Sequence, residues 1–278
     1  MNEFLLPLIS SPLFFYALIA GFLASFVGGV IGSYVVVKRI SFISGSISHS
    51  IFAGIGIFLW LERVKGISWI SPLEGAFLAG ILSALIIGWI HLHYRQREDS
   101  VIAAVWSIGM ALGILFVSQT PGYNVELTNY LVGNILWVTK QDLYFLLILD
   151  ILVISLVVIL HPRLLAICFD EEQATLQGIK VHRLYLLLLT LISITVVLLM
   201  QIVGIILVMT MLTIPATIAN LYTKQLSRMM AISVALSCLF CLIGMVLSFY
   251  FDFPTGASIA MTAGTFYVFS LFTRRQEA

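Results

Sequence analysis

Polar side chains gather inside one otherwise apolar segment, residues 41–57, which reads Ser-Phe-Ile-Ser-Gly-Ser-Ile-Ser-His-Ser-Ile-Phe-Ala-Gly-Ile-Gly-Ile. If this segment is a helix, Ser46 and His49 lie on one face. The small residues Ala53 and Gly56 continue that face. Such a face can line a pathway, but a histidine there can also be a hydrogen-bonding contact to a neighbouring helix. The segment alone leaves both interpretations open.

Other residues with chemical potential are scattered along the chain. Asp150 lies deep in an apolar run, where an aspartate is expected to face the interior of a helix bundle with a partner; a transport role is the alternative. His91 and His93 could bind a metal, but neighbouring histidines in a basic loop are usually solvated. Cys238 and Cys241 could also share a helix face around a metal, although small buried hydrophobic residues are the simpler interpretation.

Several common catalytic and nucleotide-binding motifs are absent from the sequence. There is no Gly-x-x-x-x-Gly-Lys-Ser/Thr loop, so the chain does not hold ATP in that way, and a motor for active transport would be another chain. Neither His-Glu-x-x-His nor Gly-x-Ser-x-Gly occurs. A nucleophilic pair of Ser46 and His49 would lack an identified third member and an oxyanion site. An intramembrane enzyme therefore stays only as an alternative.

The composition defines the class of protein in which these residues must be positioned. Of 278 residues, 61% are hydrophobic and 10% charged, and the mean hydropathy is +1.10. Soluble domains carry about 25% charged residues, so we expect a polytopic membrane protein. A net charge of +1 provides no field for nucleic acid. Before the first apolar run there is Glu3 but no Lys or Arg, so we expect no cleaved secretory signal.

Apolar runs long enough to cross a hydrocarbon core of about 30 Å predict an all-α bundle of about nine spans, with eight to ten possible. We treat residues 1–278 as a single domain, because no internal repeat is visible. Residues 119–142 are more polar and are expected to form an extracytoplasmic loop with a short re-entrant or interfacial helix. The expected spans are residues 13–37, 41–61, 73–92, 101–117, 143–160, 184–201, 202–222, 229–250 and 256–272.

Small residues and prolines mark expected contacts and bends within these spans. Gly28 and Gly32, and likewise Gly109 and Gly113, have the four-residue spacing of close helix contacts. Pro215 is expected to kink its helix or to leave carbonyls unpaired. A tight turn is expected between the last two spans, at the sequence Asp252-Phe-Pro254-Thr-Gly256.

The connection at residues 169–183 is the long polar segment of the second half. Asp170 followed by Gln173 has the form of a capping box, and Gly178 is placed to end the helix that begins there. We therefore predict a short amphiphilic helix over about residues 171–177. A solvated connector and a surface that contacts a partner are both compatible with this pattern.

The distribution of basic residues predicts the orientation of the spans. With the amino terminus outside, 11 of the 14 basic residues lie in the cytoplasm, and only Arg63, Lys65 and Lys140 lie outside. The carboxyl terminus is then cytoplasmic. The expected cytoplasmic residues are Lys38, Arg39, Arg95, Arg97, Arg163, Lys180, Arg183, Lys224, Arg228, Arg274 and Arg275.

Several motifs in the same order resemble those of the membrane subunits of ABC importers for zinc, manganese and iron. Residues 37–54, Val-Lys-Arg-Ile-Ser-Phe-Ile-Ser-Gly-Ser-Ile-Ser-His-Ser-Ile-Phe-Ala-Gly, resemble the second-helix motif of that family. Residues 169–178 resemble its ATPase-contacting loop, and residues 201–208, 212–216 and 248–257 resemble its later motifs. The resemblance covers residues 33–257, and the ordered set is more specific than any single motif.

The resemblance implies a type II ABC importer-like permease in a bacterial plasma (inner) membrane. It implies a homodimer with cytoplasmic ATPase subunits and an extracytoplasmic metal-binding protein. It also implies a divalent zinc, manganese or iron ion as cargo, with no tightly bound cofactor. The implied pathway residues are His49, Ser46 and Ser50, with Asp150 as an added candidate. The implied coupling residues are Asp170, Glu171, Glu172, Gln173, Ala174 and Gly178. The implied kink or gate residues are Pro215, Asp252 and Pro254.

The sequence departs from this family at one position of the second-helix motif. The family often has an aspartate four residues before its histidine, but that position is Gly45 here. The difference makes the site less anionic and favours a single imidazole completed by hydroxyl, carbonyl or water ligands. A permease for a metal chelate, of the siderophore or cobalamin type, remains an alternative.

Overall fold

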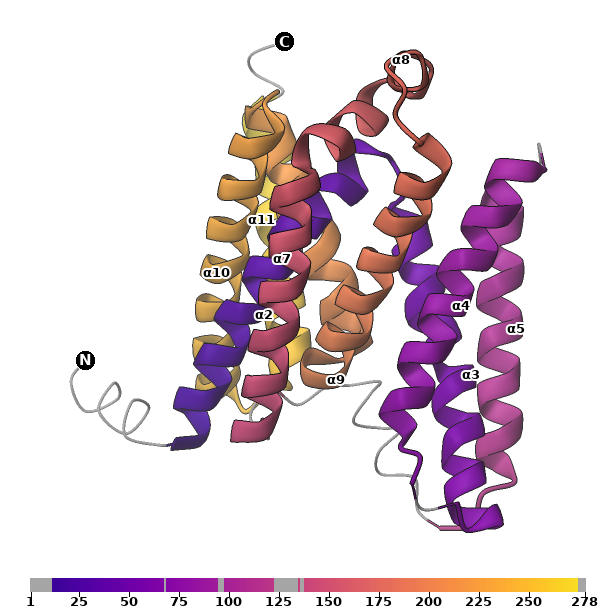
Figure 1. The fold of residues 1–278 in the computed structure, drawn as a ribbon. Helices are drawn as coiled ribbons and strands as arrows, with labels where there is room; N and C mark the ends of the chain where they lie inside the picture. Colours follow the sequence, from indigo (N-terminus) through magenta and orange to yellow (C-terminus); the bar gives the residue numbers. More distant parts are fainter. Residues whose placement is uncertain (1–11, 68, 95–97, 123–134, 136–137, 275–278) are drawn as a thin grey trace. The chain divides into compact units, whose positions relative to one another are not determined.

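The computed structural model describes residues 12–67, 69–94, 98–122, 135 and 138–274, which form an all-helical fold (Figure 1). Eight of the described helices are long and apolar enough to cross a membrane. The expected segment at residues 119–142 lies largely outside the described residues. The helices are α2 (Pro12–Val37), α3 (Ser41–Lys65), α4 (Pro72–His93), α5 (Glu98–Ser118), α7 (Lys140–Phe169), α8 (Glu171–Leu176), α9 (Val181–Tyr222), α10 (Leu226–Phe251) and α11 (Thr255–Arg274).

Hydropathy located the spanning helices to within a few residues at most of their ends. The largest difference is at α7, which continues through Pro162 to Phe169, whereas the expected span ends at residue 160. Helices satisfy their own backbone groups, which is required in hydrocarbon. Large apolar side chains such as Ile148, Ile151 and Ile159 stay exposed on α7, as expected of a surface that faces lipid rather than water.

Helix α9 contains two of the expected spans in one element of 42 residues. Its backbone leaves helical geometry at Gly204, where φ is 75° and ψ is 167°, values that essentially only glycine adopts. The segments on either side, residues 181–203 and 205–222, each have roughly the length of a membrane crossing at about 1.5 Å per residue. Counting these segments separately gives the nine expected crossings among the described residues. The expected boundary, between residues 201 and 202, lies close to this break.

The prolines inside helices do not interrupt them. Helical backbone angles continue through Pro215, so the interruption of α9 lies at Gly204 and not at the proline. Pro215 has no N–H to donate to the carbonyl of Met211, one turn earlier. That carbonyl and the one of Leu212 face Gly28 and Gly32 of α2, because a Cβ built on Gly32 would lie 2.3 Å from the Leu212 oxygen. Gly32 therefore permits the close contact predicted for the pair, whereas a Cβ on Gly28 would be in ordinary contact, 3.6 Å from the Met211 Cβ.

The helices group into two compact units, whose boundaries fall inside α2, α7 and α9. The His49 unit contains α3, α4, α5, α8, the end of α7 from residue 160 and the start of α9 to residue 197. The Asp150 unit contains α10, α11, most of α2 and the remaining parts of α7 and α9. Each unit is described by itself below. The single-domain organisation stays a prediction.

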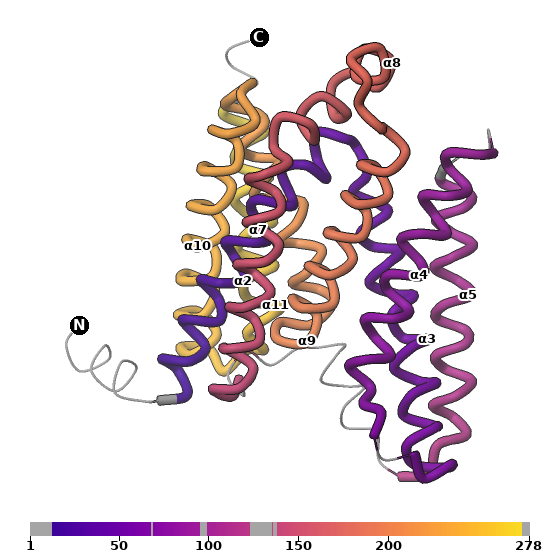
Figure 2. Tube along the Cα trace, in the orientation of Figure 1, coloured from indigo at the N-terminus to yellow at the C-terminus, as the bar shows by residue number. Residues whose placement is uncertain are grey.

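Within the His49 unit, α3 packs against both α4 and α5 (Figures 1 and 2). The contact with α4 is through Gly54 and Gly75, where a Cβ on Gly54 would lie 1.9 Å from the Gly75 carbonyl oxygen. The contact with α5 is through Gly113, where a Cβ would lie 2.6 Å from the Phe52 carbonyl oxygen. The absence of side chains at these points lets the backbones approach closely. Helix α3 is therefore held on two sides.

Within the Asp150 unit, α10 and α11 form a pair joined by residues 252–254 (Figures 1 and 2). Asp252 ends α10 in the left-handed region, with φ of 54°, and α11 begins at Thr255. The Ser248 hydroxyl donates to the Phe253 carbonyl over 2.6 Å and helps to close the turn. The tight turn predicted at this place is confirmed.

Candidate functional site

The serines of α3 satisfy their hydroxyl groups within the helix bundle. Ser44, Ser48 and Ser50 donate to carbonyls of α3 itself, three or four residues earlier. This pattern lets a polar run be buried in an apolar surrounding at little cost. Ser46 is different, because its hydroxyl donates across to the Ile102 carbonyl of α5 over 2.8 Å. Ser46 is therefore a link between two helices in this structure.

His49 lies between the α3 serines and is half-buried. Its ring stacks on the indole of Trp106 from α5, with centroids 4.2 Å apart and planes inclined by 9°. Its Nδ1 atom is buried and has no hydrogen-bond partner among the described residues. A buried polar atom without a partner is costly, and it is a candidate ligand atom. Neutral imidazole offers one acceptor nitrogen, which is the form that binds metal ions.

The face of α3 that carries Ser46 and His49 packs on α5. Ser46 bonds to Ile102, His49 stacks on Trp106, and a Cβ on Gly56 would lie 2.7 Å from the Gly113 carbonyl oxygen. The shared face predicted from the spacing is therefore confirmed, but within the His49 unit most of it is a helix contact. His49 retains a buried, unpartnered ring nitrogen.

The surroundings of His49 supply few strong metal ligands from this chain. Gly45, one turn earlier, is buried and carries no side chain. No group of three or more His, Cys, Asp or Glu side chains suited to a metal occurs in the described part of the chain. A tightly held metal centre of the three- or four-ligand type is thus not found there.

Asp150 lies in α7 and belongs to the Asp150 unit. It is 2% exposed, which confirms the prediction that it faces the protein interior. Both carboxylate oxygens are buried without a hydrogen-bond partner among the described residues, so the partner predicted for it is not found there. An intramembrane carboxyl group in this condition is a candidate functional group.

The other candidate metal ligands are engaged in ordinary contacts. The ring of His91 lies 5.1 Å from that of Tyr185, and His93 Nδ1 lies 3.0 Å from the Trp89 carbonyl oxygen. Cys241 is a buried free thiol, and its sulfur accepts a long contact of 3.6 Å from the Ser25 hydroxyl. These contacts agree with a packing or solvated role for His91, His93 and Cys241 rather than with metal binding.

The predicted short helix in the connection after α7 is present as α8. Asp170 caps it by accepting a hydrogen bond from the Gln173 N–H over 2.9 Å. The reciprocal bond of a capping box does not form, because the Asp170 N–H donates to the Ala166 carbonyl at the end of α7. Gly178 follows the helix with φ of 79°. Ala174 is buried against the unit, which fixes one face of α8.

Lys38 connects α8 to the membrane helices, a role that sequence reasoning missed. Its Nζ donates to the Ile167 carbonyl of α7 over 2.8 Å and forms an ion pair with Glu171. It also lies 5.9 Å from the ring centroid of Tyr185 on α9. Lys38 sits between α2 and α3, so it joins the start of α8 to the helix junction that precedes the serine run. These residues are far apart in sequence, and no local pattern indicates their contact.

The outer face of α8 is exposed. Leu176 is 88% exposed, and Glu172, Gln173 and Thr175 are exposed beside it. The ion pair with Lys38 places Glu171 among the internal contacts of the unit instead.

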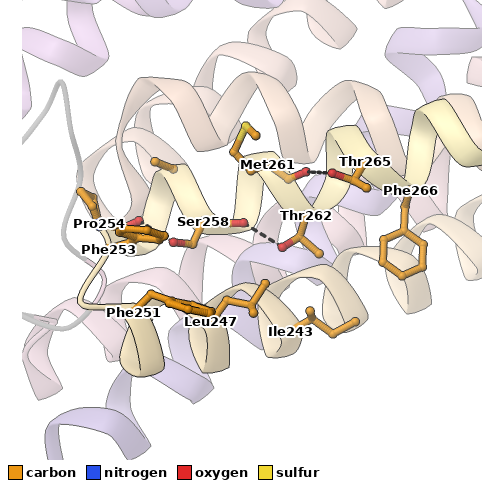
Figure 3. Close-up of a pocket in the computed structure, with 11 residues that line it drawn as sticks. Ile243, Leu247, Phe251, Phe253, Pro254, Ser258, Met261, Thr262, Thr265 and Phe266 are labelled. Atoms are coloured by element: carbon orange, nitrogen blue, oxygen red, sulfur yellow. Dashed lines mark hydrogen bonds between the residues drawn. The ribbon is translucent and has the colours of Figure 1, made fainter.

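An apolar cavity of about 580 Å³ lies between α10 and α11 (Figure 3). Its hydroxyl groups at Ser258 and Thr262 donate to carbonyls one turn earlier, those of Pro254 just before α11 and of Ser258 within it. The cavity has no charged lining residue, so its chemistry suits apolar groups rather than an ion. The lining residues are Ile243, Leu247, Phe251, Phe253, Pro254, Ala257, Ser258, Met261, Thr262, Thr265 and Phe266.

The spacing of motifs and the helical bundle agree with known transport proteins. A family model described as the ABC 3 transport family matches residues 10–274. The chain belongs to the ABC 3 transport family. It is therefore a transport permease subunit, and an intramembrane hydrolase is no longer an alternative.

Known relatives extend this result over nearly the whole chain. A Chlamydia trachomatis protein described as a "probable metal transport system membrane protein" is 47% identical, with 95% of this chain and 90% of the relative covered. The manganese transport system membrane protein MntC of Listeria innocua is 34% identical, with 94% and 90% covered. The structure of PsaBC from Streptococcus pneumoniae in complex with Fab matches with a TM-score of 0.84 and 29% identity, over 97% and 94% of the two chains.

Proposed function

We propose that this chain is the membrane permease of an ATP-driven importer of a divalent transition-metal ion, with His49 on the ion's path. The observation that carries the proposal is the buried Nδ1 atom of His49, which has no partner among the described residues. Relatives named for metal and manganese transport support this choice of cargo. Zinc, manganese and iron all accept imidazole ligands, so all three remain candidate cargoes.

The sparse ligand set near His49 suits passage better than storage. A transported ion must be held well enough to enter and loosely enough to leave. One imidazole, completed by hydroxyl, carbonyl or water oxygens, meets this requirement. The hydroxyl oxygens of Ser46 and Ser50 already donate their protons, but each oxygen can still accept or ligate. In a homodimer, two copies of His49 would be available to one ion.

Asp150 is a second candidate in the proposed pathway. A carboxylate would add a negative charge to a path on which residue 45 supplies none. Its burial and the absence of a described partner support this role. The structure describes Asp150 and His49 in different units, so the role of Asp150 is proposed separately.

Helix α8 is the proposed contact with the cytoplasmic ATPase. Its exposed residues Glu172, Gln173 and Leu176 form the contact face, while Asp170, Ala174 and Gly178 fix the helix in place. A small rigid helix between two spans can transmit the closure of an ATPase to the bundle. The ion pair with Lys38 gives Glu171 an internal bracing role in this proposal.

The proposed setting is a bacterial plasma membrane, with the amino terminus outside and the carboxyl terminus in the cytoplasm. This orientation puts 11 of the 14 basic residues on the cytoplasmic side, together with α8. The remaining partners are a second copy of the chain and an extracytoplasmic protein that delivers the ion. Pro215, Asp252 and Pro254 stay gate candidates on the basis of their helix and turn positions.

Uptake by the whole importer tests the cargo and His49 together. The permease, its ATPase and its delivery protein are reconstituted in vesicles, and Mn²⁺, Zn²⁺, Fe²⁺ and a cobalamin are offered separately. We expect ATP-dependent uptake of free ions, lost in His49→Ala. Ser48→Ala is the matched control, because that buried hydroxyl bonds only within α3. Uptake of the cobalamin but of no free ion would instead favour a chelate permease.

Gly45→Asp tests whether the missing carboxylate matters. Residue 45 lies one turn before His49, so the new side chain would share its face. We expect tighter Mn²⁺ binding and slower release, measured as a lower KM and a lower maximal rate of uptake. Unchanged kinetics would show that this face does not meet the ion.

Charge reversal on α8 tests the proposed ATPase contact. We expect Glu172→Lys to reduce metal-stimulated ATP hydrolysis while the permease still folds. Glu171→Lys is expected to lower the thermal stability of the permease as well, because it places a cation beside Lys38. Wild-type assembly and ATP hydrolysis in both variants would overturn the contact.

A further inference from the structure

We infer that Trp106 is a positioning residue, which fixes the plane of the His49 imidazole and thereby sets its affinity for the transported ion. This inference rests on the proposed function of His49 and adds a residue that no motif of the sequence indicates. Trp106 lies in α5, outside the serine and histidine run of α3. Its role follows from the geometry of the stack and from the contacts on either side of it.

The two rings form a closely parallel pair. Their centroids are 4.2 Å apart and their planes differ by 9°, so one face of the imidazole is covered by the indole. Rotation of the imidazole about its Cβ–Cγ bond would break this contact. Ligation uses the ring edge, where the nitrogen atoms lie, and stacking leaves the edge free. The indole therefore restricts the ring's orientation without occupying its ligand positions.

The position of Trp106 is fixed by α3–α5 contacts one turn away on either side. On one side, the Ser46 hydroxyl donates to the carbonyl of Ile102, four residues before Trp106. On the other side, a Cβ on Gly109 would lie 2.4 Å from the Cα of Ser50, so the two backbones are in close contact. The stack lies between these two points. These two contacts thus fix the register of α5 on α3 next to the stacked rings of His49 and Trp106.

The stack also compensates for the lack of an orienting hydrogen bond to the imidazole. A metal-binding histidine is usually oriented by a hydrogen bond from its second nitrogen to a carboxylate or a carbonyl. Neither ring nitrogen of His49 has such a bond to a described residue, so the nitrogen that does not ligate is left without an orienting partner, and residue 45 supplies no carboxylate. Orientation by an aromatic face is the available alternative. Trp106 is itself 37% exposed, and an indole face attracts cations, so it also favours an approaching ion.

Substitution by Phe and by Leu separates positioning from packing. Phe keeps a flat face, whereas Leu fills similar space without one. With Mn²⁺ as the probe in the reconstituted importer, we expect Trp106→Leu to raise KM by about tenfold, the scale of lost orienting contacts at metal sites. Trp106→Phe should restore most of the affinity, and the maximal rate should change little in either variant. Equal behaviour of the two variants would overturn the inference.

Trp60→Leu is the matched control for loss of an aromatic contact between the same helices. Trp60 of α3 meets Phe116 of α5 edge-on, with centroids 5.6 Å apart, and does not touch the stack. We expect its KM for Mn²⁺ to stay at the wild-type value. A rise as large as that of Trp106→Leu would mean that any loosening of α3 and α5 weakens binding, and would overturn the specific role of Trp106.

A fluorescence measurement covers the case in which Trp106→Leu fails to assemble. The four other tryptophans, at positions 60, 69, 89 and 137, are replaced by Phe in the full complex. Co²⁺ is then expected to quench Trp106 emission, and His49→Ala to abolish the quenching. Quenching that persists without His49, or its absence in a variant that still transports Mn²⁺, would contradict the inference. Normal Mn²⁺ uptake in His49→Ala would instead refute the proposed function itself.

Discussion

The membrane segment around His49 and the polar connection around α8 handle their polar groups in opposite ways. In α8, the Asp170 carboxylate caps the helix, and Glu171 pairs with Lys38. Around His49 the backbones are packed more tightly, yet Nδ1 is left without a described partner. A group that is fully paired stabilises one geometry, whereas an unpaired group is free to meet a ligand. Helix α8 is therefore a rigid element, whereas the region around His49 is a tightly packed site with a ring nitrogen that can bind a ligand.

The largest expected effect is from adding a methyl group where α3 meets α4. In Gly54→Ala the new Cβ would lie 1.9 Å from the Gly75 carbonyl oxygen, and backbone cannot yield easily. We expect a loss of about 3 kcal/mol or more in unfolding free energy, at the upper end of overpacking effects. Thermal unfolding of purified permease measures it. Gly264→Ala is the control, because nothing lies within 4 Å of its Cβ, and it should be neutral or slightly stabilising.

A smaller effect is expected where α8 is braced. Lys38→Met removes the bond to the Ile167 carbonyl and the ion pair with Glu171. We expect a loss of about 1–2 kcal/mol, because the ion pair is partly exposed. Fewer ions should also be transported per ATP hydrolysed, since α8 is less firmly joined to the bundle. Lys180→Met, which changes an exposed lysine of the same connection, should leave both quantities unchanged. If coupling survives in Lys38→Met, bracing by this lysine is unimportant.

Loss of the α8 cap should be smaller again. Asp170→Ala removes the acceptor for the Gln173 N–H and should destabilise the short helix by about 1 kcal/mol. Faster hydrogen exchange at the Gln173 amide is the direct measurement. Asp170→Asn keeps an acceptor oxygen and should retain most of the protection. Equal exchange in all three proteins would show that the cap contributes little.

The smallest effect is expected at the link between α3 and α5. Ser46→Ala removes one interhelical hydrogen bond, worth about 0.6 kcal/mol on average in membrane proteins. Ser48→Ala, which removes a bond within α3, should have almost no effect on thermal stability. Mn²⁺ uptake is then compared between Ser46→Ala and Ser48→Ala. A large uptake defect in Ser46→Ala with only this small loss of stability would indicate that its oxygen meets the ion directly.

Local patterns in the sequence were sufficient to predict the elements of the fold. Hydropathy gave the spanning helices, because hydrocarbon requires long apolar helical runs. Asp170 and Gly178 predicted α8, since caps depend on neighbouring residues only. The boundary expected after residue 201 lay close to the break at Gly204, whereas the backbone angles stay helical at Pro215, where a kink or unpaired carbonyls were expected.

Local sequence patterns could not predict contacts between residues that are far apart in the sequence. His49 and Trp106 meet across two helices, and Lys38 reaches Glu171 over 133 positions, with no local feature that couples them. The spacing on α3 correctly grouped Ser46 with His49 but could not show that their face packs on α5. Asp150 was correctly expected to be buried, whereas the partner expected for it is not found among the described residues. Tertiary packing decides these points.

The break at Gly204 also bears on how the chain enters the membrane during synthesis. Helix α9 has no polar loop between its two halves, so no hydrophilic segment has to be carried across the bilayer between them. A continuous helix of 42 residues would be about 63 Å long, twice the hydrocarbon thickness. The break at Gly204 instead divides α9 into two segments, each of roughly the length of one membrane crossing. Because the backbone angles at this break are closed to other residues, a glycine is required where the two segments join.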